Sequence, residues 1–96
     1  DLLDAEKKYI ISRQLLKSGT SIRANVHEAQ NSESKNDFIH KIKIATKELE
    51  DTKYWLILCD KAKNYPKNHF LNQKVQELGL VLYKILSTSI KSKNLN

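Results

Sequence analysis

The sequence predicts an all-α protein, an antiparallel up-down helical bundle forming one domain over residues 1–96. Three observations lead to this prediction. A chain of 96 residues with 40% apolar content can form one domain with a modest core. Two Gly and one Pro are too few for strands joined by tight turns. Apolar residues also recur every three or four positions, which is the spacing of helices packed lengthwise.

The first helix is predicted over residues 5–29. Its stripe of apolar and small residues consists of Ile11, Leu15, Ser18, Ile22, Val26 and Ala29. Gly19 interrupts this helix, and the alternative is a break with a new helix starting at Thr20. A continuous helix is favoured because the stripe keeps one phase across Gly19. The cost of a glycine inside a helix, about 1 kcal/mol, is then explained by close contact with a neighbouring helix.

The second helix is predicted over residues 34–64. Its stripe consists of Phe38, Ile42, Ala45, Leu49, Thr52, Leu56 and Cys59. Ser34 stands three residues before Asp37, so its hydroxyl can accept a hydrogen bond from a first-turn amide while the carboxylate favours the positive helix start. Pro66 lacks the N–H that a helix interior needs and disfavours helical angles at the residue before it, so the helix should end near Asn64.

The third helix is predicted over residues 68–92, with Asn68 as its cap. Its stripe consists of Leu71, Val75, Leu78, Leu82, Ile85 and Ser89. The short connections at 30–33 and 65–67 make successive helices antiparallel neighbours.

Three such helices leave one side of the bundle open. Further apolar residues fall off the three stripes: Tyr9, Leu16, Ile44, Trp55, Leu58, Leu80, Tyr83, Leu86 and Ile90. An apolar surface of this size needs a partner in a water-soluble protein. We therefore expect a fourth helix or neighbouring subunits to cover it, and hence a homo-oligomer.

The net charge of +6 is unevenly distributed. Residues 1–60 carry ten Lys and Arg against ten Asp and Glu, whereas residues 61–96 carry seven Lys against Glu77 alone. Such a field suits RNA or DNA, bound through phosphates without sequence reading; a solvating coat of lysines is the alternative. The candidate nucleic-acid-binding residues are Arg13, Lys17, Arg23, Lys41, Lys43, Lys47, Lys61, Lys63, Lys67, Lys84, Lys91 and Lys93, with Lys74 in addition.

Polar stripes lie beside the apolar stripes of the first two helices. A buried polar side chain has to be hydrogen-bonded, because an unpaired one costs about 1–3 kcal/mol. We interpret these residues as a structural network that fixes helix register or the choice of subunit partner, in preference to a catalytic site. The candidate network is Ser21, Asn25, Glu28, Glu48, Thr52 and Trp55.

The sequence offers little support for an enzyme. The three histidines lack metal-ligand spacing, and no glycine-rich phosphate loop or other cofactor motif occurs, so no metal and no cofactor are expected. The enzymatic alternative is a small helical ribonuclease using Arg23 and His27, which lie four residues apart and share a face. Their spacer is shorter than in such nucleases, and a solvated pair explains them equally well.

Cysteine content and hydropathy bear on the compartment. Cys59 cannot form an internal disulfide and stands in an apolar run, so we expect a buried thiol in a reducing compartment, the cytoplasm. No apolar run approaches the roughly 18–20 residues that span a bilayer, so no membrane association is expected.

Two runs, QLLKSGTSIRANVHEAQ and SKNDFIHKIKIATKELEDTKYWL, resemble the four-helix-bundle family encoded in intervening sequences of 23S ribosomal RNA genes. A relative of that family is the accessory variability determinant of diversity-generating retroelements. The resemblance is strong over residues 9–59 and weaker beyond. Its matching elements are Ser21, Ile22, Ala24, Asn25 and Glu28, then Ser34, Lys35, Phe38, Ile44, Ala45, Glu48, Thr52, Trp55 and Leu56.

The resemblance implies a ring-like homopentamer with a basic surface, associated with nucleic acid and, in the retroelement branch, with a reverse transcriptase. It also implies a further N-terminal helix before Leu3. Arg23 departs from the small residue or proline that the family pattern favours there. The leading hypothesis is therefore a non-enzymatic oligomeric bundle that binds nucleic acid or a nucleic-acid-processing partner, and the alternative is a scaffold that binds only protein.

Overall fold

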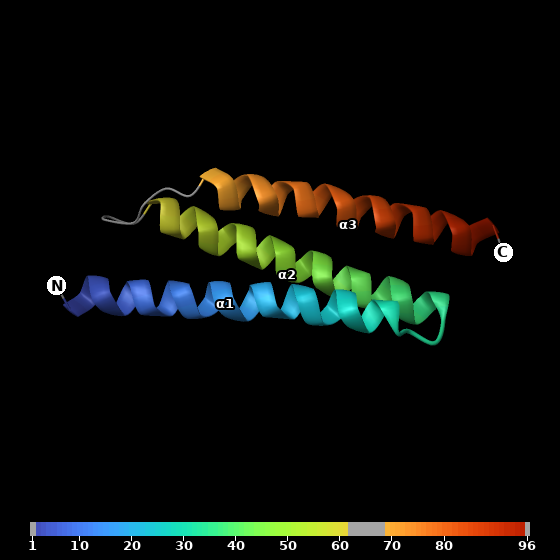
Figure 1. Ribbon diagram of the computed structural model, residues 1–96, viewed down its shortest axis with the longest axis horizontal. Helices are drawn as coiled ribbons and strands as arrows, with labels where there is room; N and C mark the ends of the chain where they lie inside the picture. Colours follow the sequence, from blue (N-terminus) through green and yellow to red (C-terminus); the bar gives the residue numbers. More distant parts are fainter. Residues whose placement is uncertain (1, 62–68, 96) are drawn as a thin grey trace.

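The computed structural model describes residues 2–61 and 69–95, with side chains described over 5–61 and 69–94. These residues form three helices, α1 (Leu2–Gln30), α2 (Lys35–Lys61) and α3 (His69–Leu95), and none of them lies in a strand. Successive helices run in opposite directions, with α2 between α1 and α3 (Figure 1). The predicted all-α, up-down arrangement is confirmed for this part of the chain.

The molecule is a thin, elongated slab. Its principal extents are 58 × 21 × 15 Å and its radius of gyration is 16.0 Å, against about 12.5 Å for a compact domain of this length. The slab shape follows from the packing, because α2 contacts both neighbours whereas the Cα atoms of α1 and α3 stay apart from each other. Side chains of α1 and α3 consequently keep faces that no described helix covers.

The helix boundaries agree closely with the predicted ones. α1 begins three residues before the predicted start and is continuous through Gly19, which excludes the alternative of a break there. At α2, the Ser34 hydroxyl accepts a hydrogen bond from the Asp37 amide at 3.0 Å, confirming the predicted cap. The predicted end of the second helix at residues 62–64, the effect of Pro66 and the Asn68 cap lie outside the described residues.

The core is built around α2. Its central cluster takes side chains from all three helices: Ile22, Ala45, Leu49, Leu56, Val75 and Leu82. Ile39 and Thr46 are also buried, although they fall outside the predicted stripe. A helix between two neighbours buries two faces, and residue 46 is rotated about 100° from residue 45. The second buried face of α2 is therefore a consequence of its middle position.

α3 is buried less deeply than its stripe predicts. Val75 and Leu82 are buried as expected, but Leu71 and Leu78 remain 39% and 37% exposed. The reason is that α3 packs against α2 alone, so part of its apolar stripe has no neighbour among the described helices. Of the residues expected on the open side, four are exposed, namely Tyr9, Leu16, Leu80 and Tyr83, whereas five are only partly exposed, namely Ile44, Trp55, Leu58, Leu86 and Ile90.

The two glycines occupy opposite environments. A Cβ atom added at Gly19 would meet no described atom within 4 Å, so the close contact predicted there is not made by the part of the chain that the structure describes. A Cβ added at Gly79 would lie 3.1 Å from Cδ2 of Leu49. The close approach that needs a glycine is therefore the one between α3 and α2.

Candidate nucleic-acid interface

A buried pair of hydroxyls joins α1 to α2. Oγ1 of Thr52 lies 2.8 Å from Oγ of Ser18 and 2.9 Å from the carbonyl oxygen of Glu48. Ser18 can in turn donate to the carbonyl oxygen of Leu15 at 3.3 Å. Ser18 is 4% and Thr52 is 7% exposed. The hydroxyls thus hydrogen-bond each other and the backbone, which explains how two polar side chains are accommodated in the core.

The other predicted network residues are not joined to this pair. Nδ2 of Asn25 donates to the Ser21 carbonyl oxygen of its own helix at 2.8 Å. The Glu28 carboxylate forms an ion pair with Lys41 at 2.9 Å, instead of approaching the polar stripe of α2, which consists of Glu48, Thr52 and Trp55. That contact, a hydrogen bond between opposite charges, lowers the pKa of the Glu28 carboxyl and raises the pKa of the Lys41 ammonium.

The polar stripe of α2 is also divided. Glu48 contributes its backbone carbonyl to Thr52, and Trp55 packs edge-to-face against Tyr54 with ring centroids 5.2 Å apart. The predicted single network is therefore replaced within this chain by a hydroxyl pair and an ion pair between α1 and α2. Sequence reasoning missed the partners Ser18 and Lys41, because a stripe identifies a face and not the residue opposite it.

The predicted nucleic-acid-binding residues differ in whether a carboxylate neutralises them. Lys41 and Lys74 form ion pairs, the latter with Glu77 at 3.4 Å. Lys63 and Lys67 lie outside the described residues. The remaining candidates are exposed, and no ion pair joins them to any residue that the structure describes: Arg13, Lys17, Arg23, Lys43, Lys47, Lys61, Lys84, Lys91 and Lys93.

These free cations occupy the outer faces of all three helices. Lys43 and Lys47 lie one turn apart on α2, and Lys84 and Lys91 lie two turns apart on α3, in each case on one face. On α2 the series of lysines, Lys43 and Lys47, is interrupted by the acidic residue Glu50. That carboxylate contacts Lys53 at 3.3 Å and accepts a hydrogen bond from the Tyr83 hydroxyl at 2.7 Å. The tyrosine and then the lysine lower the pKa of Glu50, so it stays ionised beside them.

α1 carries the most uniform positive surface. Between Glu6 and Glu28 the sequence contains no Asp or Glu. The same stretch contains five cationic side chains, namely Lys7, Lys8, Arg13, Lys17 and Arg23. Counted over residues 1–60, ten Lys and Arg are balanced by ten Asp and Glu, so the charge count assigns the positive excess to residues 61–96. None of those acidic residues lies between residues 7 and 27, so this segment is positively charged in its own right.

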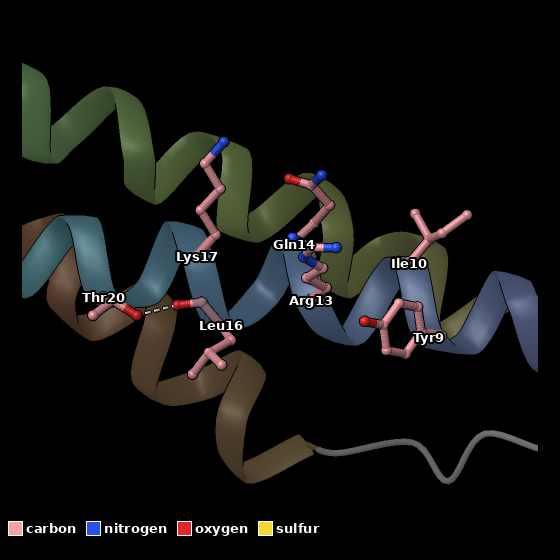
Figure 2. A pocket seen from close by; sticks show the side chains of 7 residues that line it. All are labelled: Tyr9, Ile10, Arg13, Gln14, Leu16, Lys17 and Thr20. Atoms are coloured by element: carbon pink, nitrogen blue, oxygen red, sulfur yellow. Dashed lines mark hydrogen bonds between the residues drawn. The ribbon is translucent and has the colours of Figure 1, made fainter.

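A shallow hollow lies on this segment of α1 (Figure 2). It is lined by Tyr9, Ile10, Arg13, Gln14, Leu16, Lys17 and Thr20. Tyr9 and Leu16 extend to one side of the helix and Gln14 and Lys17 to the other, with Arg13 between them. The Thr20 hydroxyl donates to the carbonyl oxygen of Leu16 in its own helix. The hollow therefore combines exposed apolar side chains with two cations that have no carboxylate partner among the described residues.

Three further features bear on the catalytic and metal-binding alternatives. Arg23 and His27 are exposed on α1, and no hydrogen bond between them is present. No group of three His, Cys, Asp or Glu suited to a metal ion occurs among the described residues. Cys59 is only partly buried, less than predicted, and this burial raises the pKa of its thiol.

Comparisons with known proteins bear directly on identity. Residues 1–84 match the family model described as 23S rRNA-intervening sequence protein. The chain belongs to this family.

The chain is also similar to a crystal structure from Bacteroides thetaiotaomicron VPI-5482, of a protein with unknown function from the S23 ribosomal protein family. The two share 37% sequence identity at a TM-score of 0.78, over 88% of this chain and 81% of that one. A search of the curated proteins finds no match. Within the described parts of this family member, no helix combines the length and apolarity needed to cross a membrane.

Proposed function

We propose that this member of the family is a non-enzymatic cytoplasmic bundle that self-associates and binds RNA or DNA through its basic surface. The observation that carries the proposal is the stretch of α1 from residue 7 to residue 27, which has five cations and no acidic residue. Arg13, Lys17 and Arg23 within it are exposed and free of ion pairs with described residues. Cations that no carboxylate neutralises can release the counterions of a phosphate backbone.

Self-association follows from the uncovered apolar surface. Leu80 is 74% exposed, and Leu71 and Leu78 of the α3 stripe are partly exposed. Burial of such side chains yields about 25 cal/mol per Å² of apolar surface. A homopentamer, the assembly implied by the family resemblance, would carry a charge of about +30 from five chains of +6, and weak contacts on each subunit would add through avidity.

The second candidate function is a scaffold that binds only protein. The same exposed apolar side chains favour it, since they fit a protein partner as well as another subunit. A nucleic-acid-processing partner such as a reverse transcriptase is compatible with both functions.

Salt dependence separates the two functions. Binding of labelled RNA and DNA is measured by fluorescence anisotropy between 50 and 200 mM salt. Nucleic-acid binding predicts a log–log slope near −0.7 for each phosphate contacted on a single strand and near −0.9 on a duplex. The absence of binding at low salt would refute the proposal and leave the scaffold. Light scattering on the same samples gives the subunit count.

Paired variants locate the surface. Arg13→Gln with Lys17→Gln tests α1, and Lys43→Gln with Lys47→Gln is the matched pair on α2, with the same loss of two charges one turn apart. The α1 pair should weaken binding more strongly, because acidic residues flank the α2 series. Incubation of labelled RNA without metal ions, with His27→Ala as the control, tests the ribonuclease alternative, for which we expect no cleavage.

A further inference from the structure

We propose that the hollow on the outer face of α1 binds an unpaired base of single-stranded nucleic acid, with the neighbouring phosphates on Arg13 and Lys17. The inference rests on the proposed function and names its ligand class. The hollow places the exposed aromatic ring of Tyr9 beside two cations that form no ion pair with a described residue, Arg13 and Lys17.

The spacing of three side chains sets the geometry. Tyr9, Arg13 and Lys17 stand at successive positions four apart, so they follow one another along the exposed face of α1, with the Tyr9 and Lys17 side chains directed to opposite edges of that face. Each step advances about 6 Å along the helix axis, at 1.5 Å per residue. Figure 2 shows the Tyr9 ring at one end of this series and the Lys17 amine toward the other, with the Arg13 side chain between them. A ring at one end and charges at the other suit a base followed by its phosphates.

The apolar members of the hollow favour an unpaired base. Tyr9 is 66% exposed, Ile10 is 53% exposed and Leu16 is 74% exposed. Tyr9 makes neither a hydrogen bond nor a ring contact with another described residue, so the face of its exposed ring is available for stacking. Stacking of a base on an aromatic side chain contributes about 1–3 kcal/mol. In a duplex both faces of each base are already covered, so only an unpaired base can make this contact.

The charge of the hollow favours an anionic ligand over a second copy of this chain. Neither Asp nor Glu occurs from residue 7 to residue 27. A second copy carries the same net charge of +6, so it is repelled overall by this surface. A phosphate chain supplies the negative charge that Arg13 and Lys17 lack within the described structure.

The test compares three ligands by fluorescence anisotropy: a labelled single strand of mixed sequence, the same strand annealed to its complement, and an abasic strand with the same number of phosphates. We expect the single strand to bind most tightly. Tyr9→Leu should weaken its binding about 5- to 150-fold, the equivalent of about 1–3 kcal/mol, whereas Tyr9→Phe should retain it. Tyr54→Leu is the matched control, since Tyr54 is a 56% exposed tyrosine on α2.

The outcomes separate this inference from the proposed function. If none of the three ligands binds at low salt, the proposed function fails and the inference fails with it. If all three bind equally and Tyr9→Leu changes nothing, nucleic-acid binding stands and the base site is refuted. If Tyr9→Leu lowers the mass measured by light scattering without nucleic acid, the hollow is a subunit contact and the inference is overturned. Circular dichroism confirms that each variant is folded.

Discussion

Replacing each of the two glycines with alanine tests the packing of the three helices. A Cβ at Gly19 would have no neighbour within 4 Å among the described residues. A Cβ at Gly79 would lie 3.1 Å from Cδ2 of Leu49 and 3.4 Å from Nζ of Lys53. The lysine amine is the end of a flexible side chain and can move away. Leu49 is 0% exposed, and its closely packed surroundings resist displacement.

The two substitutions should therefore have opposite effects on stability. Alanine inside a helix is more favourable than glycine by about 0.5–1 kcal/mol, so Gly19→Ala should raise the free energy of unfolding by this amount. At Gly79 the same gain is opposed by overpacking against Leu49, which costs about 1–3 kcal/mol. The net result is a loss of up to about 2.5 kcal/mol. A change of 1 kcal/mol moves the Tm of a domain of this size by about 4–8 °C.

Thermal unfolding followed by circular dichroism measures both variants against the unmodified protein at two protein concentrations. If Gly79→Ala stabilises the protein as much as Gly19→Ala, the close approach of α3 to α2 is refuted. A loss of stability for Gly19→Ala that grows with protein concentration would contradict the predicted gain. It would show that another chain occupies the space beside Gly19 and would support self-association.

Three further predictions concern the core and the contacts between α1 and α2. Ser18→Ala and Thr52→Val should each lower the free energy of unfolding by about 0.5–1.5 kcal/mol. The double variant should lose about as much as either single variant, because both substitutions remove the same hydrogen bond. Additive losses in urea unfolding would contradict this. Leu49→Ala should cost about 2–5 kcal/mol in the same assay, since Leu49 is fully buried; a cost within the range of surface substitutions would refute its place in the core. The pKa of the Glu28 carboxyl is below its ordinary value in the folded protein. The contribution of Glu28 to the free energy of unfolding is therefore present above the pKa of the unfolded state, about 4.3, and is lost as pH falls through the pKa of the folded state. An NMR titration should show the Glu28 pKa rising in Lys41→Met, and an unchanged pKa would exclude the ion pair.

Much of the fold could be predicted because the ends and the buried face of a helix are determined by residues close together in the sequence. The Ser34 cap and the α2 stripe depend on residues within a few turns of each other. The cap is present as predicted, and five of the seven stripe residues are buried, whereas Phe38 and Cys59 at its two ends are only partly buried. The continuous α1 followed from a phase that Gly19 does not disturb. The exposure of the α3 stripe could not be predicted in the same way, because it depends on how far α3 lies from α1 and not on the sequence of α3.

The contacts between helices depended on the axial register, which no stripe encodes. The pairs Ser18–Thr52 and Glu28–Lys41 have residue numbers that total 70 and 69, so one antiparallel register accounts for both. In this register Glu28 lies opposite residues 41 and 42, about two turns from Glu48 and about three turns from Thr52 of the candidate network. The register is set by the turn over residues 31–34, where the amides of Asn31 and Ser32 donate to the carbonyl oxygens of Glu28 and Ala29.

The residues that hold the helices together and the residues proposed to bind nucleic acid lie on opposite sides of α1. Ser18 and Ile22 face α2 and the core, whereas Arg13, Lys17 and Tyr9 are exposed and make no hydrogen bond or ion pair with the described chain. Substitutions at such exposed positions usually change stability by no more than about 0.5 kcal/mol. A loss of nucleic-acid binding in Arg13, Lys17 or Tyr9 variants would therefore report on the ligand contact itself. The same loss after Ser18→Ala would instead mean that binding depends on the register between α1 and α2.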